Sequence, residues 1–345
     1  MKKIALNKWI GGRVIKTGLA AFVTALICNI FNLPALFAVI TAIVTIEPTA
    51  SDSIKKGMIR FPAAMIGAGF AMLFESFLGQ SSLAYALAAT LTLAVCHKLR
   101  LDVGMLVATL TAVAMIAETE DQFLNSFFVR LSTTLIGLVV STVINFMILP
   151  PHYNDMVIKK VDQLYIGSGE LLKKFIEGKN SKGLRIEYQR LSKELERTFA
   201  LAQYQREEWK YRRHNLKDIQ KFGIVVKKLE YHQKILYHFG NLLYLNIEKT
   251  KLPPEQSGTI IDSATSIAAI LKDPRHKMNE QHNKLIEQLE SLFISERDRR
   301  DVTEASKVKR HISQRITVIY ELLALEDVLE DLERISHRNQ RDEIG

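Results

Sequence analysis

The sequence has few of the residue patterns on which enzymes and metalloproteins depend. Its 345 residues include only two cysteines, Cys28 and Cys96, and both lie within apolar runs. Such thiols are typical of small core residues and not of a disulfide or a metal site. The chain contains no phosphate-binding glycine-rich loop, no Walker sequence and no metal-ligand spacing. We therefore expect no enzyme, no cofactor and no metal, and any pumping must draw on an ion gradient, the membrane potential or a partner.

Charged residues are scarce in the first part of the chain. Residues 1–149 contain 11 of the 46 Lys and Arg and 7 of the 37 Asp and Glu, and residues 17–46 contain none. Because a helix needs ~20 apolar residues to cross a bilayer, residues 1–150 are predicted to form a transmembrane domain. The first apolar run is too long for a secretory signal peptide. The composition changes at Pro150-Pro151, and residues 151–340 are predicted to form a charged cytoplasmic helical domain.

The apolar part divides into runs that are separated by turn residues and charges. Asn29, Asn32 and Pro34 interrupt the first long run and indicate a helical hairpin. We predict about six short transmembrane helices, at about 14–31, 33–46, 61–78, 83–96, 101–117 and 126–149. The second and fourth are short enough to be re-entrant or half-length helices that neighbouring helices shield from lipid.

Basic residues alternate between the connections of these helices. They occur before the first helix and after the second, fourth and sixth, whereas the other connections contain no Lys or Arg. Because Lys and Arg accumulate on the cytoplasmic side, the pattern predicts a multi-pass plasma-membrane protein with both termini in the cytoplasm. The net charge of +9 fits contact with an anionic lipid bilayer. No nucleic-acid partner is expected, since the basic residues of the second half are interleaved with nearly as many acids.

Small or polar residues recur at every fourth position of three predicted helices. The three sets, each on one helix face, are Ala63, Gly67 and Ala71; Thr133, Gly137, Ser141 and Asn145; and Thr17, Ala21 and Ala25. Small residues allow close helix packing, within one bundle or between two copies. The alternative is a polar seam that lines a pathway, in which Asn145 offers hydrogen bonds to an anion.

The segment 47–60 combines a proline, small hydroxyl residues and three basic residues. Ser51 and Ser53 are candidate N-caps for a short helix. A helix N-terminus followed by Lys55, Lys56 and Arg60 favours binding of an anion. The alternative is that the basic residues only fix topology and touch lipid phosphates.

This segment and the helix after it resemble the aromatic acid exporter family, whose relatives include the fusaric-acid-resistance transporters and the plant aluminium-activated malate transporters. The shared pattern consists of Pro48-Thr49, Lys56-Gly57, Arg60 and Gly67. The order of helices and the helical second half also resemble a bacterial subgroup of that family. The resemblance implies transport of organic anions. It also implies a homo-oligomer, at least a dimer, because some family members carry a doubled membrane module and this chain has one.

We therefore predict a transporter that exports or conducts small organic anions, including aromatic carboxylates. Lys55, Lys56 and Arg60 would gather the anion at the cytoplasmic mouth, and Arg130 would form a second positive station near the outer end. Glu47 would be a proton-sensitive group near the inner mouth, or would pair with Arg60.

The second half repeats apolar residues at spacings of three and four, which predicts a bundle of antiparallel helices. No strand-like alternation occurs, so the whole chain is predicted to be all-α. This half leaves two alternatives to transport open. The protein could be a membrane-anchored scaffold whose helical domain binds a partner, or a sensor whose helical domain binds a ligand and gates the bundle.

Overall fold

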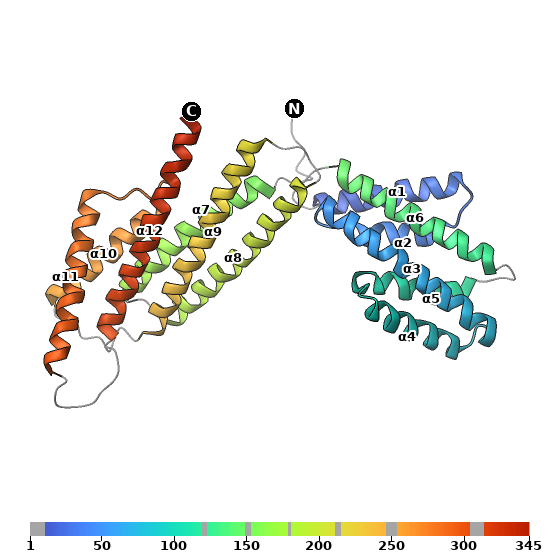
Figure 1. The fold of residues 1–345 in the computed structure, drawn as a ribbon, viewed down its shortest axis with the longest axis horizontal. Helices are drawn as coiled ribbons and strands as arrows, with labels where there is room; N and C mark the ends of the chain where they lie inside the picture. The colour runs from blue at the N-terminus through green and yellow to red at the C-terminus, as the bar shows by residue number, and fades with distance from the viewer. Residues whose placement is uncertain are drawn as a thin grey trace. The chain divides into compact units, whose positions relative to one another are not determined.

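A computed structural model describes residues 11–118, 123–148, 153–178, 181–210, 215–245, 254–303 and 314–344. All regular structure in these ranges is helical, which confirms the all-α class (Figure 1). The chain forms two compact units. The first contains residues 1–151 and 206–212, and the second contains residues 152–205 and 213–345. The predicted boundary at Pro150-Pro151 lies outside the described residues.

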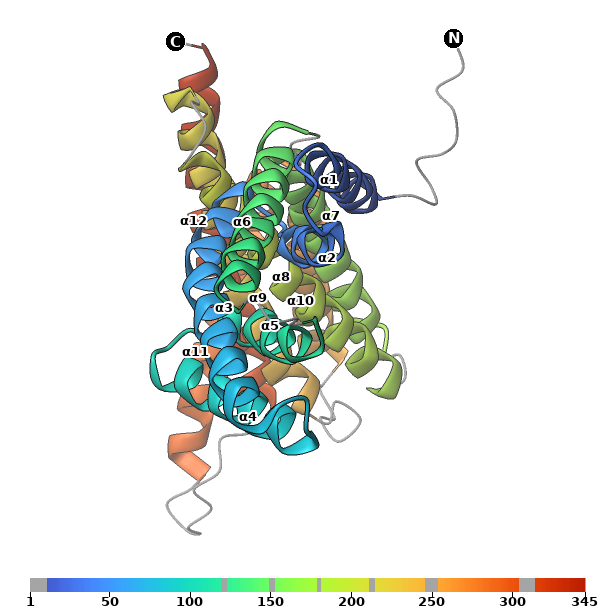
Figure 2. The ribbon, with the colours of Figure 1, turned by 90° about the vertical axis from the view of Figure 1, so that its right-hand side faces the viewer.

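Two groups of three helices build the first unit. Its helices are α1 (Gly12–Ile30), α2 (Ala35–Thr45), α3 (Ala50–Leu78), α4 (Ser82–Lys98), α5 (Met105–Glu118) and α6 (Phe123–Met147). A short 3-10 helix, Asp102–Gly104, precedes α5. Helices α1, α2 and α6 pack against one another, and so do α3, α4 and α5 (Figure 2). The contact between α3 and α6 joins the two groups.

The local sequence explains where α1 and α2 meet and where α3 begins. Asn32 has φ 49° in the turn after α1, a conformation that asparagine adopts more readily than most residues. The hairpin therefore lies where the sequence predicts it. The predicted N-caps Ser51 and Ser53 are wrong, because the cap of α3 is Thr49, whose side chain accepts a hydrogen bond from the Asp52 backbone N–H at 3.0 Å.

The predicted start of the third helix near residue 61 is also wrong. Helix α3 begins at Ala50 and continues through Pro62 to Leu78. Charged side chains do not by themselves end a helix. The basic residues of the segment 47–60 therefore lie in the first turns of α3. Pro62 removes one backbone donor without breaking the helix.

Within the described part of the first unit, three helices are long and apolar enough to cross a membrane: Gly12–Ile30, Ala50–Leu78 and Asn125–Met147. Two shorter apolar helices accompany them, Ala35–Thr45 and Asp102–Ala117. Large apolar side chains point outward from these elements, for example Phe22, Leu106 and Phe128, each more than 60% exposed. Exposed apolar faces of this extent indicate a unit that is surrounded by lipid.

Glycines allow close contacts on either side of the junction between the two groups. A Cβ atom at Gly67 would overlap the carbonyl oxygen of Ala108 in α5. A Cβ atom at Gly137 would overlap the carbonyl oxygen of Ala38 in α2. Each glycine therefore lets two helix backbones approach more closely than any other residue would permit. Ala63 and Ala71, one turn before and after Gly67, are fully buried.

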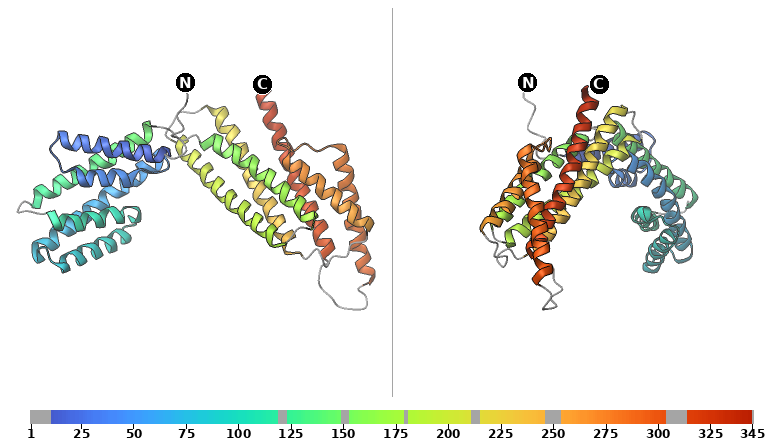
Figure 3. Two further views of the ribbon diagram at one scale, coloured as in Figure 1. Left: turned by 180° about the vertical axis from the view of Figure 1, so that it is seen from behind. Right: turned by 60° about the vertical axis from the view of Figure 1, so that its left-hand side comes forward.

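The second unit contains helices α7 (Tyr153–Ile176), α8 (Ser181–Trp209), α9 (Leu216–Tyr244), α10 (Pro254–Lys272), α11 (Glu280–Thr303) and α12 (Gln314–Ile344). Of α8, only the part up to Gln205 belongs to this unit. Helix α7 packs against α9 and α10, and α12 packs against α9, α10 and α11 (Figure 3). Leucine, isoleucine and phenylalanine side chains fill the core between them. The amphipathic pattern of the sequence therefore lies on the faces that these helices bury.

Two buried histidines make the stability of the second unit depend on pH. His232 is fully buried and His276 is 2% exposed, and burial lowers the pKa of each from 6.5 to about 4. The unfolded chain therefore takes up protons below pH 6.5 that the folded chain refuses, so stability falls as the pH drops from 7 towards 4. We expect a loss on the order of 2 kcal/mol per histidine at pH 5.

Thermal unfolding of the full chain in detergent at pH 7 and pH 5 tests this expectation. His232→Gln should remove about half of the pH-dependent loss, because one of the two titrating groups is gone. His97→Gln is the control, since the His97 side chain is 79% exposed, and it should keep the full loss. Equal losses in all three proteins would contradict the expectation.

Candidate anion-binding site

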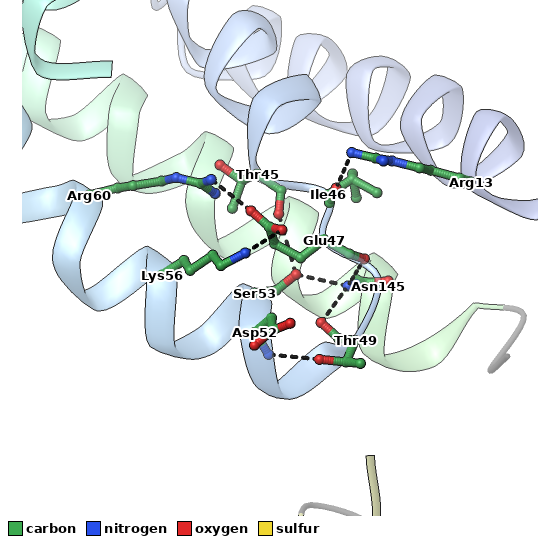
Figure 4. Close-up of polar contacts among 10 residues, drawn as sticks. All are labelled: Arg13, Thr45, Ile46, Glu47, Thr49, Asp52, Ser53, Lys56, Arg60 and Asn145. Carbon is green, nitrogen blue, oxygen red and sulfur yellow. Dashed lines mark hydrogen bonds and ion pairs between the residues drawn. The ribbon is translucent and has the colours of Figure 1, made fainter. Parts of the chain in front are cut away.

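Glu47 connects two of the basic residues that the sequence singles out. It lies in the connection between α2 and α3, and its carboxylate accepts hydrogen bonds from Lys56 Nζ at 2.8 Å and from Arg60 Nη2 at 2.7 Å (Figure 4). Lys56 and Arg60 are four residues apart in α3, so they share one face of the helix. The three groups together carry one net positive charge.

The carboxylate of Glu47 is held in its charged form. Burial alone would raise its pKa, but the hydrogen bonds and charges of Lys56 and Arg60 outweigh burial, and the net effect lowers the pKa below 4.5. At neutral pH the ionised Glu47 therefore cancels one of the two positive charges of Lys56 and Arg60.

Arg60 has hydrogen-bonding capacity that the protein leaves unused. The residue is 6% exposed. Its Nη2 binds Glu47, whereas its Nε and Nη1 atoms are buried without a hydrogen-bond partner among the described residues. Buried donors are nearly always paired, so an exception calls for an explanation. A guanidinium with two unused donor nitrogens is suited to bind the carboxylate of a ligand.

The side chain of Asn145 is buried and makes its hydrogen bonds within the protein. Its side-chain amide donates to the carbonyl oxygens of Glu47 and Thr49, at 3.0 and 3.1 Å, and to Ser53 Oγ at 2.8 Å. Its side-chain oxygen accepts from Lys16 Nζ at 2.8 Å. Asn145 thus ties α1, α6 and the connection before α3 together. Sequence reasoning missed the role of Lys16, which is 6% exposed, because its partner lies 129 residues away.

Lys55 does not join Lys56 and Arg60. It binds Glu207 at 2.8 Å, a residue in the part of α8 that belongs to the first unit. Glu207 also accepts from Ser51 Oγ at 3.0 Å, and Glu208 accepts from the Ala50 backbone N–H at 2.7 Å. The N-terminus of α3 therefore does bind anionic groups, and these are carboxylates of the chain itself. Hydrogen bonds from Lys210 and Lys55 lower the pKa of Glu207 to about 2.

Arg130 lies apart from the Glu47 cluster, in the wall of an apolar cavity. It is 7% exposed, its guanidinium lies 3.4 Å from the centre of the Phe37 ring, and its Nη2 donates to Thr111 Oγ1 at 3.4 Å. The cavity has a volume of about 150 Å³ and lies between α2 and α5, and Arg130 of α6 is the one charged residue among the described residues that line it. We call it the α2–α5 cavity. Its lining is mostly aliphatic.

Similar proteins extend over both units. The family described as "Aromatic acid exporter family member 1" matches residues 8–148. A UPF0421 protein of Bacillus cereus (strain ZK / E33L) is 42% identical over 337 residues, which cover 96% of this chain and 95% of the relative. A UPF0421 protein of Halalkalibacterium halodurans is 39% identical over 339 residues, which cover 97% of this chain and 92% of the relative.

Proposed function

Since the chain belongs to the aromatic acid exporter family, we propose that this membrane transporter moves small organic anions out of the cell across the plasma membrane. The observation that carries the proposal is Arg60, a buried guanidinium with two donor nitrogens that no described residue uses. Buried basic residues in a membrane protein are costly and are typical of ion pathways. Lys56, four residues before Arg60, adds a second positive charge.

The proposal includes an orientation for the first unit. Six helices would weave through the membrane, with the basic connection between α2 and α3 and both termini in the cytoplasm. Helix α2 has 11 residues and is thus about 16 Å long, which is half the ~30 Å hydrocarbon core. It would therefore be a half-length element that α1 and α6 shield. A homo-oligomer would complete the pathway.

Glu47 gives the proposed site a built-in competitor for the substrate. Its carboxylate already occupies one position on Arg60, at 2.7 Å. An incoming carboxylate would bind either Nε or Nη1, on opposite sides of the guanidinium, and would meet repulsion from Glu47. Protonation of Glu47 would relieve that repulsion, so anion entry would favour low pH at this mouth.

Flux in proteoliposomes tests the function. Vesicles that contain the purified full chain should release radiolabelled benzoate or malate down an imposed gradient faster than protein-free vesicles do. Retention of trapped glucose by the same vesicles is the control for leakage. If no anion moves under any pH gradient or membrane potential, the proposal fails and the scaffold or sensor alternative gains support.

A further inference from the structure

We propose that a second copy of this chain places the outer face of its α8 in a groove between α11 and α12 of the second unit. The inference goes beyond the proposed transport function and does not depend on it. It concerns how copies of the chain contact one another through their second units, and not what the chain carries.

The groove between α11 and α12 has a volume of about 420 Å³ and is strongly acidic. We call it the α11–α12 groove. Among the described residues that line it, six carry a carboxylate and one, Arg334, is basic. Three of the acids, Glu287, Glu290 and Asp327, are exposed and make no ion pair within the described part of the chain. Because like charges gathered in a hollow repel one another and attract the opposite sign, the groove favours a positively charged occupant.

Apolar side chains form part of the same groove. Met278, Ile286 and Leu323 line it and are half-buried. The lining positions within 283–290 of α11 and within 323–330 of α12 both have the spacing i, i+3, i+4 and i+7, so each set lies on one helix face. Each face is about 10 Å long, at 1.5 Å per residue. Two such faces side by side are suited to bind a third helix whose own contact residues follow the same spacing.

The outer face of α8 has the complementary pattern. Ile186, Arg190, Lys193 and Arg197 follow one another at i, i+4, i+7 and i+11 and therefore share one face, which we call the α8 face. All four are exposed, and Ile186 is 68% exposed. Arg190 and Lys193 make no ion pair with any residue that the structure describes, and Arg197 pairs with Glu194 at 2.5 Å. An exposed aliphatic side chain flanked by basic ones matches an apolar floor flanked by acids.

The α8 face is held away from the groove of its own chain. Lys160 and Lys174 of α7 bind Glu194 and Glu187 of α8 at 2.9 and 2.7 Å. Helices α8 and α11 lie at opposite edges of the second unit (Figures 1 and 3). The contact therefore needs a second copy. Because it joins two different surfaces, and because copies in one membrane share their orientation, it builds a ring around an axis normal to the membrane.

Other occupants fit these two surfaces less well. A single metal ion is far smaller than about 420 Å³, since even a water molecule takes up ~30 Å³, and it would leave Ile286 and Leu323 uncovered. An anionic membrane surface would neutralise the α8 face and leave the acids of the groove uncompensated. A second copy of α8 neutralises both surfaces and covers the apolar floor with Ile186.

Cysteine cross-linking in membranes tests the contact. Two full chains with different tags are co-expressed, one with Ile186→Cys and the other with Ile286→Cys, and mild oxidation then links cysteines that lie close together. We expect a disulfide-linked pair that contains both tags. Neither variant expressed alone should give a linked pair, because each has its cysteine on one side of the contact only. Ile261→Cys in place of Ile186→Cys is the matched control, since Ile261 is 44% exposed on α10, and should lower the yield at least ~tenfold.

Charge reversal separates a specific contact from chance collisions. Arg190→Glu combined with Lys193→Glu in the Ile186→Cys chain should lower the yield of the linked pair by about tenfold or more, because like charges would then meet across the contact. Glu287→Lys combined with Glu290→Lys in the other chain should restore the yield.

Lys217→Glu combined with Lys227→Glu is the control for the change in net charge. Both residues are exposed on α9, and their reversal should leave the yield unchanged. A yield with Ile186→Cys that is zero, or equal to that with Ile261→Cys, would overturn the contact. A yield that survives the reversal of Arg190 and Lys193 would overturn it as well. Loss of the linked pair in vesicles of anionic lipid, but not in vesicles of neutral lipid, would also overturn it, because a membrane would then cover the α8 face.

The contact and the proposed transport function can fail separately. The cross-link is measured without any anion flux, so a linked pair in a protein that carries no anion leaves the contact standing and the transport function wrong. Vesicles that carry anions with a protein that gives no linked pair leave transport standing and the contact wrong.

Discussion

Replacing Gly67 by alanine is expected to separate α3 from α5 and to destabilise the first unit. The added Cβ would overlap the carbonyl oxygen of Ala108 and lie 2.9 Å from its carbonyl carbon. Both atoms belong to the backbone, so no side-chain rotation can relieve the overlap and one helix must move. Overpacking of this kind costs about 3 kcal/mol. We expect a clear fall in the thermal unfolding midpoint of the full chain in detergent.

Gly69→Ala is the matched control for this variant. Gly69 lies two residues further along α3, is exposed, and has no atom within 4 Å of the position that a Cβ would take. Alanine there should keep or raise stability, by up to about 1 kcal/mol, because alanine favours helix over glycine. An unchanged midpoint in Gly67→Ala, or an equal fall in both variants, would show that the close contact with Ala108 does not hold α3 and α5 together.

Local patterns predicted part of this architecture. The turn at Asn32 follows from residues within one short segment. The spacing of Ala63, Gly67 and Ala71 placed three small residues on one face of α3. The start of α3 differs from the prediction because the sequence predicts a separate short helix with Lys56 and Arg60 before the third transmembrane helix, whereas the structure joins the two into one helix that Thr49 caps. The start of α3 is set by the cap at Thr49 and not by the charges of Lys56 and Arg60.

Long-range contacts could not be predicted in the same way. Arg130 lies on Phe37, and Lys16 binds Asn145, in both cases across long stretches of sequence. A single sequence specifies which residues share a helix face, but not which faces of separate helices meet. The sequence therefore marked Arg130 as unusual without indicating the aromatic ring beside it or the cavity next to it.

Replacing Arg60 by alanine is expected to abolish anion flux while the protein still folds. The variant removes the guanidinium whose unused donors, Nε or Nη1, we assign to the substrate, and it leaves Glu47 paired with Lys56. Loss of a charged hydrogen-bonding partner of a carboxylate should reduce flux at least ~30-fold in proteoliposomes. Arg60→Lys keeps the charge and loses the planar donors, so its flux should fall between those of the wild type and Arg60→Ala.

Two comparisons separate a role in binding from a role in folding. Lys98→Ala removes an exposed basic residue at the end of α4 and should leave flux unchanged. Arg60→Ala must elute from a sizing column as the wild type does, because an aggregated variant would lose flux for a trivial reason. If Arg60→Ala elutes normally and carries anions at the wild-type rate, the unused donors of Arg60 serve no anion. Glu47 and Arg60 would then form a structural ion pair that fixes the connection between α2 and α3.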